Sequence, residues 1–244
     1  ALGRICDGVS EVRRASREEI KAGAQFIKLM ANGGVSSPTD PIANLGFSRE
    51  ELLAAVEEAE NAQTYVAAHL YTDDAIRRAI ECGVKSIEHG NLIDSATAAR
   101  MAELGAFLVP TLAAYDAMDR RGAEIGLNAI SLAKNTEVLS KGQEAIQLAL
   151  AAGVTVGFGS DLMGDLEDDQ LRGVKLQSAA AGPVEMLRSM TESNAKLIGD
   201  TRLGHLGAGA FGDAVVLSAD PIAEPSALWE QDARLAVVQG GHGG

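Results

Sequence analysis

The sequence predicts an α/β protein built around a mainly parallel sheet. Short apolar or β-branched runs alternate with amphipathic segments along most of the 244 residues. This βαβα order favours parallel strands that are joined by crossover helices. No stretch reaches the roughly 18 uninterrupted apolar residues that span a bilayer, so we expect a soluble protein without a membrane partner.

Five runs have the composition of strands and are bounded by Gly, Asp, Asn or Ser. The predicted strands are Gln25–Met30, Thr64–His69, Val84–Glu88, Ala106–Val109 and Val154–Phe158. Ser48-Arg-Glu-Glu51 is a capping box that predicts a helix over Ser48–Ala62, and Gly83 follows a helix predicted over Asp73–Glu81. An open doubly wound sheet and a closed eight-stranded barrel both fit, but no GxGxxG motif supports a dinucleotide-binding sheet.

The composition of the sequence changes after residues Pro183–Ile198. Four glycines precede an apolar strand at 213–218, and a second strand is predicted over Leu235–Gln239. We therefore predict a large α/β unit over residues 1–200 and part of a small β unit over residues 201–244. The last residues, Gly240-Gly-His-Gly-Gly244, are expected to form a flexible end.

The charge balance argues against a nucleic-acid partner. The formal net charge is −13, from 21 basic and 34 acidic residues, and no Lys/Arg cluster offers a counter-charge to phosphates. The two cysteines form no CxxC pair, which fits a reducing compartment. We predict a cytoplasmic location.

Polar side chains close three of the predicted strands. His69, His89 and Asp161 stand at strand ends, where a parallel barrel gathers its active-site residues. Each histidine alone is better explained by a hydrogen-bonded loop position than by a metal ligand. Because the chain has only 4 histidines, two of them at equivalent strand ends together favour a metal site.

Lys28 is predicted in the middle of the first strand, where a sheet covered on both faces should be apolar. A free buried ammonium costs several kcal/mol. Carboxylation by CO₂ would remove that cost and give a carbamate able to bridge two divalent cations about 3.5–4 Å apart. The alternative is a solvated lysine on an edge strand, but the apolar content favours a central strand.

Four longer motifs show a resemblance to a known family. They are Phe26-Ile-Lys28-Leu-Met-Ala-Asn-Gly-Gly34, the segment from His69 to Ile80, Gly83-Val-Lys-Ser-Ile-Glu-His89-Gly, and Gly157-Phe-Gly-Ser-Asp161. Together with Gly204–Asp213 they are similar to the amidohydrolase superfamily, in particular its prolidase-like branch. The resemblance implies a (β/α)8 TIM-like barrel with a small β-sandwich appendage.

The resemblance also implies a binuclear site with two divalent metal ions, expected to be zinc. Lys28 would be the carboxylated bridging ligand on the fourth barrel strand, and His69 and His89 would be ligands on the fifth and sixth. Asp161, on the eighth strand, would be both a metal ligand and the catalytic residue. It would accept a proton from a metal-bridging hydroxide and pass it to the departing amine.

The implied substrate is a dipeptide or N-acyl amino acid that is cleaved at the amide beside its C-terminal residue, proline or another. Tyr71 would donate a hydrogen bond to the oxyanion or the substrate carboxylate. Its alternative is an ordinary loop aromatic. Backbone N–H groups at Gly34 and Val35 would bind the substrate carboxylate, unless this turn only serves the chain reversal.

One departure from the family is plain, because no His-x-His pair occurs anywhere in the sequence, whereas the family's first strand carries one. We therefore expect barrel strands one to three to be missing and a complementing N-terminal segment to be needed. We also expect the protein to be a homo-oligomer. Two other functions stay open. One is a ring-opening or deaminating amidohydrolase with the same ligands, and the other is an inactive metal-binding fragment.

Overall fold

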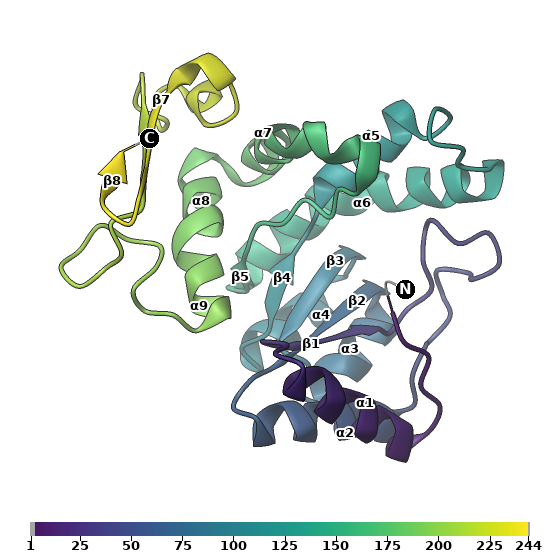
Figure 1. Cartoon of the computed structure of the whole chain (residues 1–244). Helices are drawn as coiled ribbons and strands as arrows, with labels where there is room; N and C mark the ends of the chain where they lie inside the picture. Colours follow the sequence, from purple (N-terminus) through teal and green to yellow (C-terminus); the bar gives the residue numbers. More distant parts are fainter. Residues whose placement is uncertain (1–2, 244) are drawn as a thin grey trace.

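The computed structural model describes residues 3–243 and contains a five-stranded parallel sheet with the order β1-β2-β3-β4-β5 (Figure 1). The strands are β1 Ile27–Met30, β2 Val66–Thr72, β3 Ser86–Leu92, β4 Phe107–Val109 and β5 Thr155–Val156. The α/β class, the parallel direction and the five strands predicted from the sequence are confirmed. Within residues 3–243 this sheet is open, so the closed eight-stranded barrel stays a prediction.

Helices connect the strands as the alternation predicts. They are α1 Val9–Lys21, α2 Arg49–Asn61, α3 Asp73–Glu81, α4 Ser95–Glu103, α5 Leu112–Arg121, α6 Ala129–Ala152, α7 Gln170–Ala181, α8 Pro183–Arg188 and α9 Asn194–Ile198. The capping box of α2 is present, because Ser48 Oγ accepts the Glu51 N–H and the Glu51 carboxylate accepts the Ser48 N–H. A π-helical turn at Ser189–Ser193 joins α8 to α9. No helix within residues 3–243 has both the length and the apolar character for a bilayer crossing.

The position of Lys28 differs from the prediction. In the described part of the chain β1 is the edge strand of the sheet and pairs with β2. Ile27 and Leu29 are buried, whereas Lys28 and Met30 point to the other face and are exposed. The prediction that Lys28 lies buried on a central strand is therefore wrong for the described part of the chain. Burial then gives no reason for the carboxylation of Lys28. The carbamate rests on the family resemblance alone.

The second sheet is antiparallel and contains β6 Ala214–Leu217, β7 Arg234–Gln239 and β8 His242–Gly243. The flexible end predicted after Gly240 is wrong as far as residue 243. Gly240 and Gly241 both have positive φ, which lets a two-residue turn return the chain so that Gly243 pairs with Val238. Gly244 lies outside the described residues, and the boundary at residue 200 stays a prediction.

Ion pairs fasten α1 to α2. Glu58 is only 5% exposed and accepts hydrogen bonds from Arg13 at 2.8 Å and from Arg17 at 2.7 Å. These guanidinium groups, Arg17 first, lower the pKa of Glu58 to about 2. Glu57 is 58% exposed and pairs with Arg13 alone among the arginines at this contact. The two neighbouring glutamates therefore differ both in burial and in the number of arginine partners.

We expect Glu58→Gln to lower the free energy of unfolding by about 1–3 kcal/mol, because it removes charge-assisted hydrogen bonds to a buried acceptor. The carboxylate stabilises the folded chain fully above its ordinary pKa of 4.5, and this stabilisation is lost as the pH falls towards 2. Urea titrations at pH 7 and at several values below 4.5 measure both effects. Glu57→Gln is the matched control and should change stability by less than about 0.5 kcal/mol. Equal losses for the two variants would contradict the prediction.

Candidate active site

His69 and His89 lie side by side on neighbouring strands. The register of β2 and β3 pairs Leu70 with His89, and the two imidazole centroids are 4.5 Å apart at an interplanar angle of 74°. The predicted strand-end positions are slightly wrong, since β2 continues to Thr72 and β3 to Leu92. The predicted proximity of the two histidines is found in the structure.

Both imidazoles are neutral at physiological pH. His69 is 6% exposed and His89 is 3% exposed. Burial lowers the pKa of His69 to about 4 and the pKa of His89 well below its ordinary value. A neutral imidazole keeps one nitrogen lone pair, which is the form that binds a metal ion. His89 Nδ1 is 2.6 Å from Thr111 Oγ1. This hydrogen bond uses only one of the two ring nitrogens, and His89 Nε2 takes no part in it.

Lys28 is close enough to both histidines and to Asp161 for its charge to act on their pKa values. The positive charge of Lys28 adds to the effect of burial in lowering the pKa of His69 and His89. Asp161 follows β5 in an irregular segment and is exposed as a whole residue. Desolvation of its carboxyl group nevertheless raises the pKa of Asp161, and the charge of Lys28 opposes this shift. His89, Thr111 and Asp161 all have positive φ, a conformation that is strained for residues other than glycine and often marks functional sites.

Tyr71 completes the cluster. Its ring stacks on His89 with centroids 5.2 Å apart and meets His69 edge-on at 4.8 Å. Tyr71 lies within β2 and is buried, so the alternative of a loop aromatic is wrong. The hydroxyls of Tyr115 and Tyr71 are hydrogen-bonded at 3.0 Å. Burial raises the pKa of both phenols, which therefore act as neutral hydrogen-bond donors.

The segment after β1, residues 31–45, covers this cluster. Asn32 is buried and connects the two ends of this segment with β2. Its Nδ2 donates to the Ile42 and Asn44 carbonyls, and its Oδ1 accepts the Tyr71 N–H at 2.7 Å. Val35 packs in the same buried apolar cluster as Tyr71 and Tyr115. The fold thus places the end of β1 over the end of β2.

Lys134, on α6, fixes the turn that contains Gly34 and Val35. Its ammonium donates to the carbonyls of Gly34, Ser37 and Asp40 at 3.1, 2.7 and 2.6 Å. The Gly34 carbonyl and the Val35 N–H belong to one planar peptide group, so Lys134 also sets the direction of that N–H. A β-carbon built on Gly34 would lie 4.0 Å from His69 Nε2, which places the turn beside the histidines.

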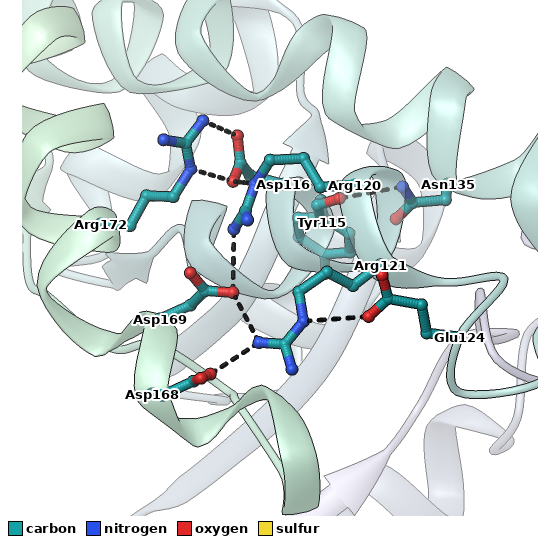
Figure 2. A network of polar contacts seen from close by, with 9 residues as sticks. All are labelled: Tyr115, Asp116, Arg120, Arg121, Glu124, Asn135, Asp168, Asp169 and Arg172. Carbon is teal, nitrogen blue, oxygen red and sulfur yellow. Dashed lines mark hydrogen bonds and ion pairs between the residues drawn. The ribbon is translucent and has the colours of Figure 1, made fainter.

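A network of ion pairs holds the segment that carries Asp161 (Figure 2). Arg121, on α5, contacts Asp168 and Asp169 and donates to the Asp165 carbonyl. Asp116, also on α5, pairs with Arg172 on α7. The helix after β4 and the segment after β5 are therefore connected by several charged contacts, which restrict the movement of the segment between Asp161 and α7.

Four residues of this neighbourhood were not predicted from the sequence: Asn32, Thr111, Tyr115 and Lys134. Thr111 follows β4 as Asp161 follows β5, so the strand-end rule that selected the histidines also applies to it. Asn32 follows β1 in the same way. Tyr115 and Lys134 lie on helices, and no sequence signal marks them.

The donor set fits part of a divalent metal site. His69 and His89 supply two neutral nitrogen ligands, which suit zinc and its neighbours. Residues 3–243 contain no cluster of three or more His, Cys, Asp or Glu side chains arranged to hold a metal ion. The complete ligand set of Lys28, His69, His89 and Asp161 therefore stays a prediction.

Comparisons with known proteins agree with this geometry. The chain is 33% identical over 239 residues to ochratoxinase of Aspergillus niger, and the match covers 97% of this chain and 50% of that protein. A prolidase in complex with N-methylphosphonate-L-proline is 47% identical with a TM-score of 0.97, over 100% of this chain and 60% of the other. A Xaa-Pro dipeptidase with methionine in its active site is 28% identical with a TM-score of 0.87, over 96% and 58%.

The chain thus spans about half to three fifths of the length of these relatives. The model of the amidohydrolase family matches residues 2–242, which is nearly the whole sequence. The family resemblance read from the motifs around Lys28, His69, His89 and Asp161 is therefore confirmed, and the chain belongs to the amidohydrolase family.

Proposed function

We propose that this chain supplies most of the active site of a metal-dependent hydrolase that cleaves the amide bond of a dipeptide or an N-acyl amino acid. The observation that carries the proposal is the pair of neutral, buried histidines 4.5 Å apart with Tyr71 packed against both. The relatives include a prolidase with a bound phosphonate analogue of a prolyl peptide and a Xaa-Pro dipeptidase, which supports a C-terminal proline in the substrate.

The residues of this chain divide the work between binding and proton transfer. His69, His89 and a carboxylated Lys28 would hold divalent cations, with zinc as the first choice. Such cations, when bound, would polarise the scissile carbonyl and acidify a water molecule. Asp161 would accept the proton of that water and return it to the leaving amine. Tyr71 would donate to the developing oxyanion, and N–H groups of the Gly34–Val35 turn would receive the substrate carboxylate.

The His-x-His pair of the family is absent from this sequence, so we propose that a further segment supplies it. Within the described residues β1 is an edge strand, and its outer backbone edge is the place where additional barrel strands would add to the sheet. Homo-oligomeric assembly and a cytoplasmic location remain predictions.

The test compares the chain alone with a preparation that also contains the His-x-His segment. We expect the complete preparation to bind about two zinc ions per site and to hydrolyse Xaa-Pro dipeptides or N-acyl amino acids, with loss of activity after chelation. Metal content and a substrate panel that includes cyclic amides and aminated heterocycles measure this. Turnover of only the latter two groups would favour the ring-opening or deaminating alternative. Zinc binding without any turnover would favour an inactive metal-binding protein.

A further inference from the structure

Tyr115 is a buried residue of α5 for which the proposed mechanism has no use. It is 1% exposed, and its hydroxyl lies 3.0 Å from the hydroxyl of Tyr71. Its backbone carbonyl accepts a hydrogen bond from Asn135 Nδ2 at 2.9 Å, as Figure 2 shows, and the adjacent Asp116 is paired with Arg172. The phenol of Tyr115 is therefore fixed in place, and the ion-pair network holds its helix.

Two hydrogen bonds, one at His89 and one at Tyr71, decide which protons the site can offer to a ligand. His89 Nδ1 is 2.6 Å from the Thr111 hydroxyl, and the Tyr115 hydroxyl is 3.0 Å from the Tyr71 hydroxyl. Each hydroxyl has a single proton to donate, so each of the two bonds can run in one direction or in the other. Thr111 keeps its place beside His89 at the cost of a φ of +47°, which is unusual for a β-branched residue.

The two directions have different chemical consequences. If Tyr115 donates to Tyr71, the Tyr71 proton is left over for a ligand. If His89 donates from Nδ1 to Thr111, His89 Nε2 keeps its lone pair. In the reverse directions Tyr71 donates to Tyr115, and Thr111 donates to His89 Nδ1, so that His89 carries its proton on Nε2. Only the first pair of directions leaves both an imidazole nitrogen for a cation and a phenol proton for an oxyanion.

We propose that Tyr115 is a positioning residue for amide hydrolysis, because its donation to the Tyr71 hydroxyl oxygen leaves the Tyr71 proton free to bind the oxyanion of the substrate. The proposal rests on the proposed function. Tyr115 touches neither substrate nor metal in it, and it acts through Tyr71. The relevant chemical class of ligand is a tetrahedral oxyanion next to an amino-acid carboxylate.

The first part of the test observes the hydrogen bond directly in this chain. The sequence contains only three tyrosines, Tyr65, Tyr71 and Tyr115, so a sample labelled with ¹³Cζ-tyrosine gives three resonances that single Tyr→Phe variants assign. Tyr115→Phe removes the donor and keeps the ring. We expect it to shift the Tyr71 resonance and to leave the Tyr65 resonance unchanged. An unchanged Tyr71 resonance would overturn the proposal.

The second part is a double-mutant cycle in the preparation that hydrolyses the dipeptide. Loss of an oxyanion donor costs about 10²–10³-fold in kcat, which is the expectation for Tyr71→Phe. Tyr115→Phe should lower kcat about tenfold and change KM less than about twofold, whereas in the Tyr71→Phe background it should cost less than about twofold. The affinity for N-methylphosphonate-L-proline, a tetrahedral analogue, should show the same pattern. Tyr115→Phe should weaken binding when Tyr71 is present and have little further effect in the Tyr71→Phe background.

Two results of the cycle would overturn the role of Tyr115. One is full activity of Tyr115→Phe, and the other is an equal cost of this substitution with and without Tyr71, as expected for a purely structural residue. Absence of turnover in every preparation, with the Tyr71 resonance shifted as expected, would overturn the proposed function and the hydrolytic role, while the hydrogen bond itself would stand. The spectroscopic and kinetic parts therefore separate the two failures.

Discussion

Replacement of Asp161 by asparagine should lower kcat about 10³-fold in the preparation that hydrolyses the dipeptide. An amide cannot accept the proton of the attacking water, and a positioned general base typically contributes 10²–10⁴-fold. Asparagine is the right substitution here because Asp161 has a φ of +52°, a conformation that Asn tolerates as Asp does. The fold around the site should therefore remain intact.

The matched control for Asp161→Asn is Asp165→Asn. Asp165 belongs to the same segment after β5, carries the same charge, and contacts Arg121 through its backbone carbonyl. Its substitution should leave kcat within about twofold of the unmodified protein. Zinc content, measured on both variants, distinguishes a lost proton acceptor from a lost ligand. An Asp161→Asn variant that keeps its zinc and retains at least a fifth of the activity would contradict the assignment.

The parts of the fold that were predicted well are those with local signals. Both ends of α3 are found as predicted, since acidic residues open the helix and Gly83 closes it, and Ser48 with Glu51 marks the start of α2. The strand predicted over Val154–Phe158 is only two residues long. Side chains that lie far along the chain, Gln177 and Asn194, bind its last residues in place of a neighbouring strand, and no local pattern reveals this.

In the site, too, features with local sequence signals were predicted and those that depend on distant contacts were not. The two histidines meet although the register pairs His89 with Leu70, because the positive φ of His89 breaks the regular alternation of side chains at that position. Tyr115 reaches Tyr71 across 44 sequence positions and Lys134 reaches Gly34 across 100, and such contacts depend on how helices pack. The error for Lys28 has another cause. A four-residue strand with alternating burial contains enough apolar residues to resemble a central strand, although its second face is exposed.

Replacement of Gly33 by alanine should disrupt the segment over the site. A β-carbon at Gly33 would lie 1.8 Å from the Pro41 carbonyl oxygen and 2.6 Å from its carbon. Both atoms belong to the backbone, so the two ends of segment 31–45 must move apart. The hydrogen bond from the Gly33 N–H to the Asn44 carbonyl, now 3.0 Å long, must then lengthen or break. We expect a loss of about 3 kcal/mol in unfolding free energy or a locally open segment. Urea unfolding and amide hydrogen exchange measure the two outcomes.

Gly34→Ala is the control that separates closure of the segment from the lining of the site. A β-carbon there meets only His69 Nε2, at 4.0 Å, so stability should change by less than about 1 kcal/mol. The added methyl group would nevertheless point at the histidine that we assign to the metal and occupy space beside the proposed carboxylate-binding turn. We therefore expect Gly34→Ala to raise KM for the dipeptide while the hydrogen exchange of residues 31–45 stays normal. Equal destabilisation by both alanines would mean that the turn is held by its backbone conformation rather than by the close approach of Pro41, and normal substrate binding by Gly34→Ala would remove this turn from the site.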